Sequence, residues 1–180
     1  MNLDNVIKGR RSIRKYKATD VPDSVIGQIL DLARYTPSSM NGQPWHFIVV
    51  RDNVTKKLIA EVKNRHCPPE KRNYRADFIE DAPVLIAVCV NIEKSYGREI
   101  ENGVLAAATI MLAAYSRGLG SVYLSAYNRE KPELEEEIKE ILSIPGDYKP
   151  VTIIPLGYPD EIPDEKKLKP QEEIVHYEKF

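Results

Sequence analysis

Six cations lie within ten residues in the run KGRRSIRKYK at residues 8–17, and no carboxylate lies among them. Gly9 is expected to end a short helix just before the run, which would leave the cations on a turn with free backbone N–H groups. In an extended segment Arg10, Ser12 and Arg14 would point to one face. Two guanidinium groups and a hydroxyl suit a phosphate together with a polar ring edge. Two other interpretations stay open here, a solvated basic surface and a nucleic-acid patch.

A second polar group follows in the run RYTPSSMNGQPWHFIVV. Pro37 is expected to end a helix, and Ser38, Ser39, Asn41 and Gln43 then place several donors and acceptors close to the sole tryptophan. Amides that both donate and accept suit a planar heterocycle whose edge alternates donors and acceptors. The alternative is an ordinary loop rich in turn-forming residues.

The overall composition predicts one globular domain without nucleic-acid or membrane chemistry. With 26 basic and 27 acidic residues among 180, the formal net charge is −1, whereas a general nucleic-acid binder would be basic. The longest apolar run, residues 103–114, is too short and too rich in alanine to span a bilayer. No signal peptide is visible, and two cysteines without CxxC spacing indicate a reducing compartment, so a cytoplasmic location is expected. The cysteines and histidines lack metal-ligand spacing, so no metal site is expected.

An alternation of helices and strands must position these candidate residues. Apolar residues at helical spacing and short β-branched runs predict the elements. The strand at 83–92 is apolar throughout, which predicts burial on both faces. We expect a three-layer α/β domain around a sheet of four or five strands. The expected helices are residues 2–9, 21–35, 53–65 (with Asn53 as the cap), 99–117 and 131–142, and the expected strands are residues 46–50, 83–92, 121–127 and 150–159.

Four motifs in order, RRSIRKY, PSSMNGQPWHFIVV, GLGSVYLSAY and IIPLGYP, strongly resemble the nitroreductase family of FMN-dependent oxidoreductases. The resemblance covers essentially the whole chain. It implies one domain, residues 1–180, with an α+β, three-layer α/β/α fold around a central, mostly antiparallel sheet. It also implies an intertwined homodimer with FMN at the subunit interface. The apolar helix 100–117 would form the core of that interface, and the tail, residues 160–180, would wrap the partner.

The resemblance also implies which residues hold FMN. Arg10 and Ser12, assisted by Arg11, would bind the phosphate or the ribityl chain, and Arg14 would lie at the N1/O2 edge of the flavin. A fixed cation there favours the negative charge that reduction brings and raises the flavin potential. Further contacts would come from a loop of the other subunit (Pro37, Ser38, Ser39, Asn41 and Gln43), from a strand end whose backbone N–H approaches N5 (Leu124, Ser125 and Ala126), and from tail cations over the phosphate (Lys167 and Lys169).

Leu168 stands where many members of the family have Arg, so the tail contact in this chain is expected to be shifted or weaker. The expected activity is a ping-pong transfer of electrons from NADH or NADPH, through FMN, to a nitroaromatic, a quinone or another flavin. The chain has no GxGxxG motif, and no catalytic acid or base is assigned, because solvent can supply the protons.

Three alternatives to this activity stay open. A reductive dehalogenase and a flavin-fragmenting enzyme share the fold, but both add a lid or an extended substrate segment, and residues 66–78 are the one short region available for it. A non-catalytic flavin-binding module is the third. The sequence does not identify the electron acceptor, the choice between NADH and NADPH, the tail lysine that contacts phosphate, or the role of residues 73–78.

Overall fold

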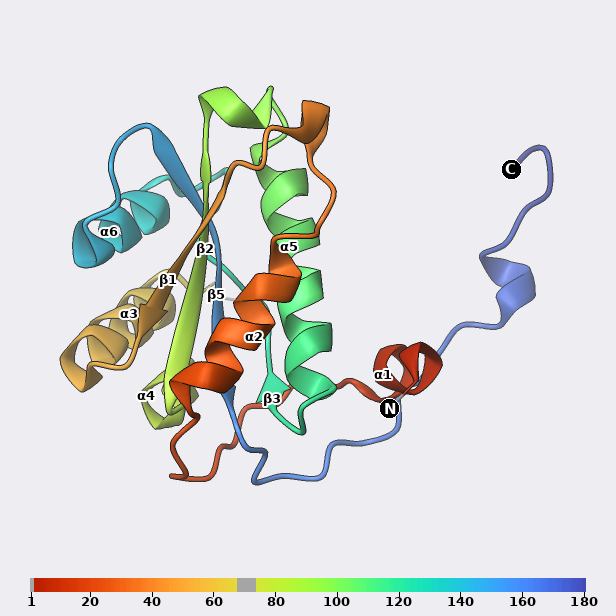
Figure 1. Ribbon diagram of the computed structural model, residues 1–180, viewed down its shortest axis with the longest axis horizontal. Coiled ribbons are helices and arrows are strands. Elements are labelled where there is room, and N and C mark those ends of the chain that lie inside the picture. The colour runs from red at the N-terminus through yellow and green to blue at the C-terminus, as the bar shows by residue number, and fades with distance from the viewer. Residues whose placement is uncertain (1, 68–73) are drawn as a thin grey trace.

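A computed structural model describes residues 2–67 and 74–180, and its centre is a five-stranded sheet (Figure 1). The strand order is β1-β2-β5-β3, with β4 also paired to β5, and every ladder between these strands is antiparallel. The predicted α+β class with a mostly antiparallel sheet is confirmed. The strands are β1 (Trp45–Val50), β2 (Val84–Asn91), β3 (Gly120–Ser121), β4 (Leu124–Ser125) and β5 (Tyr148–Gly157).

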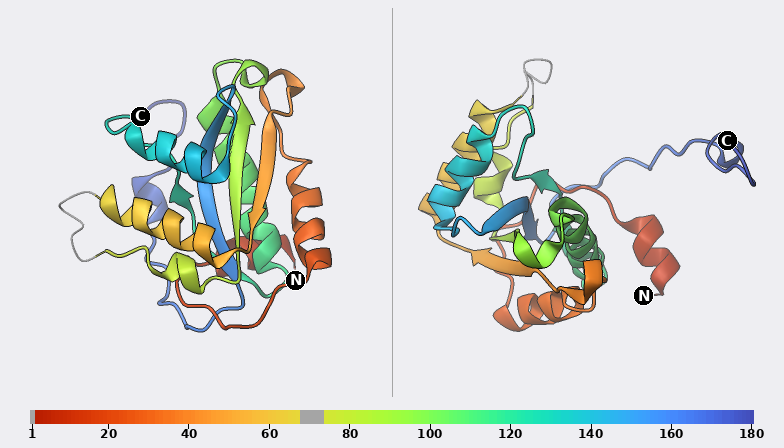
Figure 2. Two further views of the ribbon diagram at one scale, coloured as in Figure 1. Left: turned by 90° about the vertical axis from the view of Figure 1, so that its left-hand side faces the viewer. Right: turned by 90° about the horizontal axis from the view of Figure 1, so that it is seen from above.

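Helices cover both faces of the sheet, as Figure 2 shows from above. Successive side chains of β2 point to opposite faces, so Leu85, Ala87 and Cys89 join one core while Ile86 and Val88 join the other. This confirms the three layers and the burial of the strand on both faces over residues 84–90, whereas Ile92 lies beyond the strand and is exposed. One face carries α3 (Asn53–Arg65), α4 (Phe78–Asp81) and α6 (Glu133–Leu142), and the other carries α2 (Asp23–Ala33) and α5 (Glu99–Tyr115).

Helix α5 lies very close to the sheet at Gly103, where a built Cβ atom would be 2.5 Å from Cγ2 of Val151. Its inner face, with Ala106, Ala107 and Ile110, is fully buried. Its other face keeps Val104 and Leu105 about two-fifths exposed. Within one chain this helix is buried on one side, and its expected role in the core of a subunit interface stays a prediction.

Gly103→Ala is expected to lower the free energy of unfolding by about 1–2 kcal/mol. Overpacking a close contact costs about 1–3 kcal/mol, and the better helix propensity of alanine returns up to about 1 kcal/mol. Gly27→Ala in α2 is the matched control, because nothing lies within 4 Å of its built Cβ. There we expect stabilisation by about 0.5–1 kcal/mol. Urea titration of both variants measures the two effects, and a stable Gly103→Ala protein would contradict the close approach.

The predicted strand at 121–127 is wrong as a continuous element. Both β3 and β4 pair with β5 in one register, Ser121 with Leu156 and Leu124 with Ile153. Continuing that register places Val122 opposite Pro155. Because proline has no N–H to donate, the ladder is interrupted there.

The predicted cap of α3 is also wrong by one residue. The cap is Asp52, whose carboxylate accepts hydrogen bonds from the backbone N–H and the hydroxyl of Thr55, both at 2.8 Å. These bonds, that from the backbone N–H first, lower the pKa of Asp52. Asn53 is instead the first helical residue.

The two ends of the chain leave the body of the molecule. Helix α1 (Leu3–Gly9) contacts α5, and the tail beyond residue 160 runs outward past it, with a short 3₁₀ turn, η4 (Gln171–Glu173), as its regular structure (Figures 1 and 2). Large apolar tail residues such as Ile162 and Tyr177 are almost wholly exposed. Two other 3₁₀ turns, η1 (Ser39–Asn41) and η3 (Glu93–Ser95), flank the N-terminal end of α5.

Candidate functional site

The basic segment that follows α1 runs beside β3 in an extended conformation. Ser12 forms a parallel bridge with Ser121, and the N–H of Ile13 donates to the Ser121 carbonyl at 3.1 Å. Ile13 and Tyr16 are buried, while Ser12 and Arg14 lie on the exposed side. Ser12 and Arg14 therefore share the exposed side around the buried Ile13, as expected, and the pairing with β3 produces this, while Lys15 is exposed as well.

The expected free N–H groups of this segment are largely engaged. The Arg10 N–H caps α1 by donating to the Val6 carbonyl, and a carboxylate oxygen of Glu161 accepts from both Arg14 and Lys15. The segment therefore offers side chains, more than backbone donors, to an anion. The engaged groups are the N–H groups of Arg10, Ile13, Arg14, Lys15 and Lys17.

Arg11 does not join Arg14. Its Nη1 donates to the carbonyls of Lys8 and Arg10, at 2.7 and 3.0 Å, and its Nε donates to the carbonyl of Asp164 at 3.4 Å. It fastens the start of the tail to the end of α1. A role for Arg11 beside the FMN phosphate stays a prediction.

Arg14 lines a cleft of about 350 Å³ beside β4. The cleft brings together three predicted residues, Arg14 from the basic segment and Leu124 and Ser125 from β4. Tyrosines and cations line much of the rest, and no carboxylate belongs to the described lining. Such a wall suits a planar polar ring with an electron-rich edge. The lining residues are Arg14, Lys63, His66, Cys67, Tyr74, Tyr123, Leu124, Ser125, Tyr127, Asn128 and Leu134.

Lys63 is a site residue that the sequence analysis missed. Its ammonium group donates to the carbonyl of Ser125 at 2.6 Å, which ties α3 to β4 inside the cleft. The helical spacing could have indicated it. Lys63 follows the buried Ile59 by four residues and therefore lies on the inward face of α3.

The strand end contributes Leu124 and Ser125 to the cleft wall but not Ala126. Ala126 is fully buried, and its N–H donates to the carbonyl of Val151 at 3.0 Å. That N–H is therefore occupied within the sheet. The hydroxyl of Ser125 donates to the carbonyl of Tyr127 at 2.6 Å, which folds the chain back after β4.

The polar loop of residues 37–43 lies at the opposite end of α5 from β3 (Figure 1). The N–H of Ser39 donates at 3.0 Å to the amide oxygen of Asn102, in the first turns of α5, and that helix of 17 residues spans about 25 Å. None of the loop residues belongs to the described lining of the Arg14 cleft, so one chain does not bring the loop into that cleft. Met40, Asn41 and Gln43 have φ values of 52°, 54° and 46°, a left-handed conformation that costs energy in residues with side chains and concentrates at functional sites.

The tail lysines also lie away from the cleft. Lys167 and Lys169 are exposed on the outward segment, and the described part of the chain gives neither a hydrogen bond nor an ion pair. Asn73 lies outside the described residues, as do residues 68–72 of the suggested lid. Of the neighbouring residues, Tyr74 lines the cleft, whereas Arg75 pairs with Asp77 at 3.1 Å on the surface.

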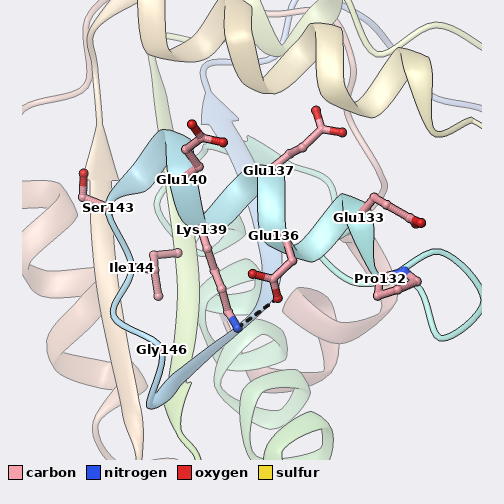
Figure 3. Close-up of a pocket in the computed structure, with 9 residues that line it drawn as sticks. All are labelled: Pro132, Glu133, Glu136, Glu137, Lys139, Glu140, Ser143, Ile144 and Gly146. Carbon is pink, nitrogen blue, oxygen red and sulfur yellow. Dashed lines mark ion pairs between the residues drawn. The ribbon is translucent and has the colours of Figure 1, made fainter.

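A second hollow, of about 820 Å³, lies elsewhere, along α6 (Figure 3). Four glutamates line it, and Glu136 pairs with Lys139 at 3.6 Å across it. It contains none of the predicted site residues and is a charged helix surface. Among the described residues no cluster of three metal-ligating side chains occurs, and none of the described helices is long and apolar enough to cross a membrane.

Comparison with known proteins places these features in a family, because the model of the nitroreductase family matches residues 7–158. The chain belongs to the nitroreductase family. This confirms the resemblance found in the sequence motifs.

Several members of the family are similar over nearly full length. A Methanothermobacter thermautotrophicus protein named “Putative NADH dehydrogenase/NAD(P)H nitroreductase” is 40% identical over 100% of this chain and 88% of its own. An iodotyrosine deiodinase of Thermotoga neapolitana is 31% identical over 99% of this chain and 98% of its own. The structure of an FMN-dependent nitroreductase from Clostridium difficile superposes with a TM-score of 0.86, at 31% identity, over 99% of this chain and all of its own.

Proposed function

We propose that this member of the nitroreductase family is an FMN-dependent oxidoreductase that passes electrons from NADH or NADPH to an electron-poor acceptor. The observation that carries the proposal is the cleft in which Arg14 and β4 meet, lined by tyrosines and cations and by no carboxylate of the described residues. FMN supplies the site with a ring that accepts a hydride and later gives up its electrons.

The residues present fit FMN. A cleft of about 350 Å³ is of the size that encloses most of a single ring system. Arg14 presents a permanent cation to the polar ring edge, and Ser12 lies two residues away on the same exposed side of the segment. Arg10, at the end of α1, lies two residues further, where a phosphate at the far end of the ribityl chain would need a cation.

We further propose a homodimer in which the loop of one subunit completes the cleft of the other. The absence of the loop from the described lining of the cleft in one chain supports this arrangement, as does the strained, exposed conformation of the loop. Leu3, Ile7, Val104 and Leu105 leave apolar surface on α1 and α5, and the tail carries more. A second copy would bury this surface. Light scattering should give the mass of a dimer, and a truncation after residue 162 should weaken it.

A direct experiment tests the activity. The purified protein, loaded with FMN, should show flavin absorbance that bleaches anaerobically with NADH or NADPH and returns with a nitroaromatic or a quinone. Stopped-flow reoxidation with a panel of acceptors then ranks the candidates. A colourless protein that takes up no added FMN would overturn the proposal.

Dehalogenation is the second candidate, supported by the similarity to the Thermotoga neapolitana iodotyrosine deiodinase. Release of iodide from 3-iodotyrosine by the reduced holoenzyme, faster than its reoxidation by quinones and nitroaromatics, would favour this activity. No iodide release, with rapid quinone turnover, would favour the first.

A further inference from the structure

Tyr74 reaches the cleft from a segment that the sequence analysis left without a role. The ring is half-buried against the core under α3 and α6 and packs edge-on against Phe78, with ring centroids 6.3 Å apart and an interplanar angle of 78°. Its carbonyl accepts a contact from the thiol of Cys67 at 3.9 Å. The ring is therefore packed on Phe78, and the backbone of Tyr74 contacts Cys67, before any ligand binds.

Tyr74 and Arg14 line the same cleft, and the Tyr74 hydroxyl interacts with the Arg14 guanidinium there. Burial raises the pKa of Tyr74 above its ordinary value, while Arg14 opposes that shift. The hydroxyl is thus neutral near pH 7, and its oxygen is available to accept from the Arg14 guanidinium. No carboxylate forms an ion pair with Arg14 among the described residues, so Tyr74 is the anchor of this long, flexible side chain on the cleft wall.

We propose that Tyr74 is a positioning residue that holds the Arg14 guanidinium toward the flavin ring and thereby helps to set the redox potential of the bound flavin. The inference rests on the proposed function, because it takes the cleft as the site of the ring. A long arginine side chain loses conformational entropy when it is held in one position. Its charge stabilises the negative charge of a reduced ring most strongly when it is held in position before the reaction. Tyr74 supplies that order before FMN arrives.

Tyr74→Phe in the full-length, FMN-loaded protein tests the proposal. The ring and its packing on Phe78 stay, and the hydroxyl is lost. We expect a lower flavin midpoint potential and a reduction by NADH or NADPH slowed by about tenfold, the lower end of what one lost hydrogen bond to a charged group supplies. The FMN dissociation constant should change by no more than about threefold, less than one such hydrogen bond is worth. Tyr148→Phe is the control, because that ring packs edge-on against His46 at 4.7 Å, outside the cleft lining.

Two further variants test whether Tyr74 acts through Arg14. In an Arg14→Gln background, Tyr74→Phe should shift the potential no further, because interacting residues are not additive. Tyr74→Gln, whose amide oxygen can accept from Arg14, should restore part of the wild-type potential. Additive effects of Arg14→Gln and Tyr74→Phe would overturn the proposal, as would a wild-type potential in Tyr74→Phe.

A measurement without flavin separates this inference from the proposed function. In the FMN-free protein, the Arg14 Nε–H resonance should be shifted and protected in the wild type and should move toward the solvent-exposed position in Tyr74→Phe. An unchanged resonance overturns the positioning role. If that resonance moves but Arg14→Gln leaves the flavin potential unchanged, the assignment of the cleft to the ring fails instead.

Discussion

Arg14→Gln is expected to lower the midpoint potential of the FMN-loaded protein and to slow its reduction by NADH or NADPH by about 10–100-fold. Removing one donor aimed at a developing charge commonly costs about 100–1,000-fold, and the exposure of Arg14 screens its charge and reduces the effect. Glutamine keeps a polar side chain of similar reach, so the cleft should stay formed. Potentiometric titration and anaerobic stopped-flow measure the two quantities.

Lys17→Gln is the matched control for Arg14→Gln. It removes the same charge three residues along the same segment, where the backbone N–H donates to the carbonyl of Tyr158 at 2.9 Å and the side chain is exposed. Its effect on potential and rate should be small. Equal effects in the two variants would mean that the basic residues 8–17 act on the flavin only through their total charge. The assignment of Arg14 to the ring edge would then fail.

Asn102→Ala is expected to lower the free energy of unfolding by about 2–3 kcal/mol and to weaken FMN binding. The side chain is 1% exposed, and its amide joins two segments, accepting from the N–H of Ser39 at 3.0 Å and donating to the carbonyl of Ser95 at 3.2 Å. Alanine leaves both partners without their bond, and an unsatisfied buried group costs about 1–3 kcal/mol. The loop that holds Ser39 should loosen, and hydrogen exchange of its amides should accelerate.

Asn53→Ala serves as the control for this substitution. Asn53 is exposed at the start of α3, and the described structure gives its side chain no hydrogen bond. The unfolding free energy and the FMN affinity of the Asn53→Ala protein should match those of the wild type. Full retention of FMN affinity in Asn102→Ala, together with unchanged loop exchange, would show that the loop is not part of the binding site.

The periodic spacing of apolar residues predicted most of the helices and strands, because each element must turn apolar side chains toward one or both of the buried cores. The alternation of β2 between the cores and the apolar stripe of α2 both appear as periodicity along the chain. The break between β3 and β4 could not be predicted in the same way. It depends on Pro155, which lies more than thirty residues away, and on which strand pairs with which.

The site residues that belong to family motifs could be predicted from the sequence. Those that reach the site only through tertiary contacts could not. Arg14, Leu124 and Ser125 share the cleft as the family motifs implied. The resemblance places Arg11 beside Arg10 and Ser12 at the phosphate, and the carbonyls that its guanidinium binds, one of them from Asp164, do not show in the local sequence. Lys63 and Tyr74 come from elements with no motif of their own, so their approach to Arg14 depends on packing of the whole fold.

The distance between the Arg14 cleft and the Asn102-anchored loop has a consequence for genetics. If each cavity takes its cleft from one subunit and its loop from the other, a mixed dimer of an Arg14→Gln chain and an Asn102→Ala chain concentrates both lesions in one cavity. The second cavity then contains an intact cleft and an intact loop. Two impaired alleles expressed together should therefore complement each other, and the recovered activity should follow the fraction of mixed dimers.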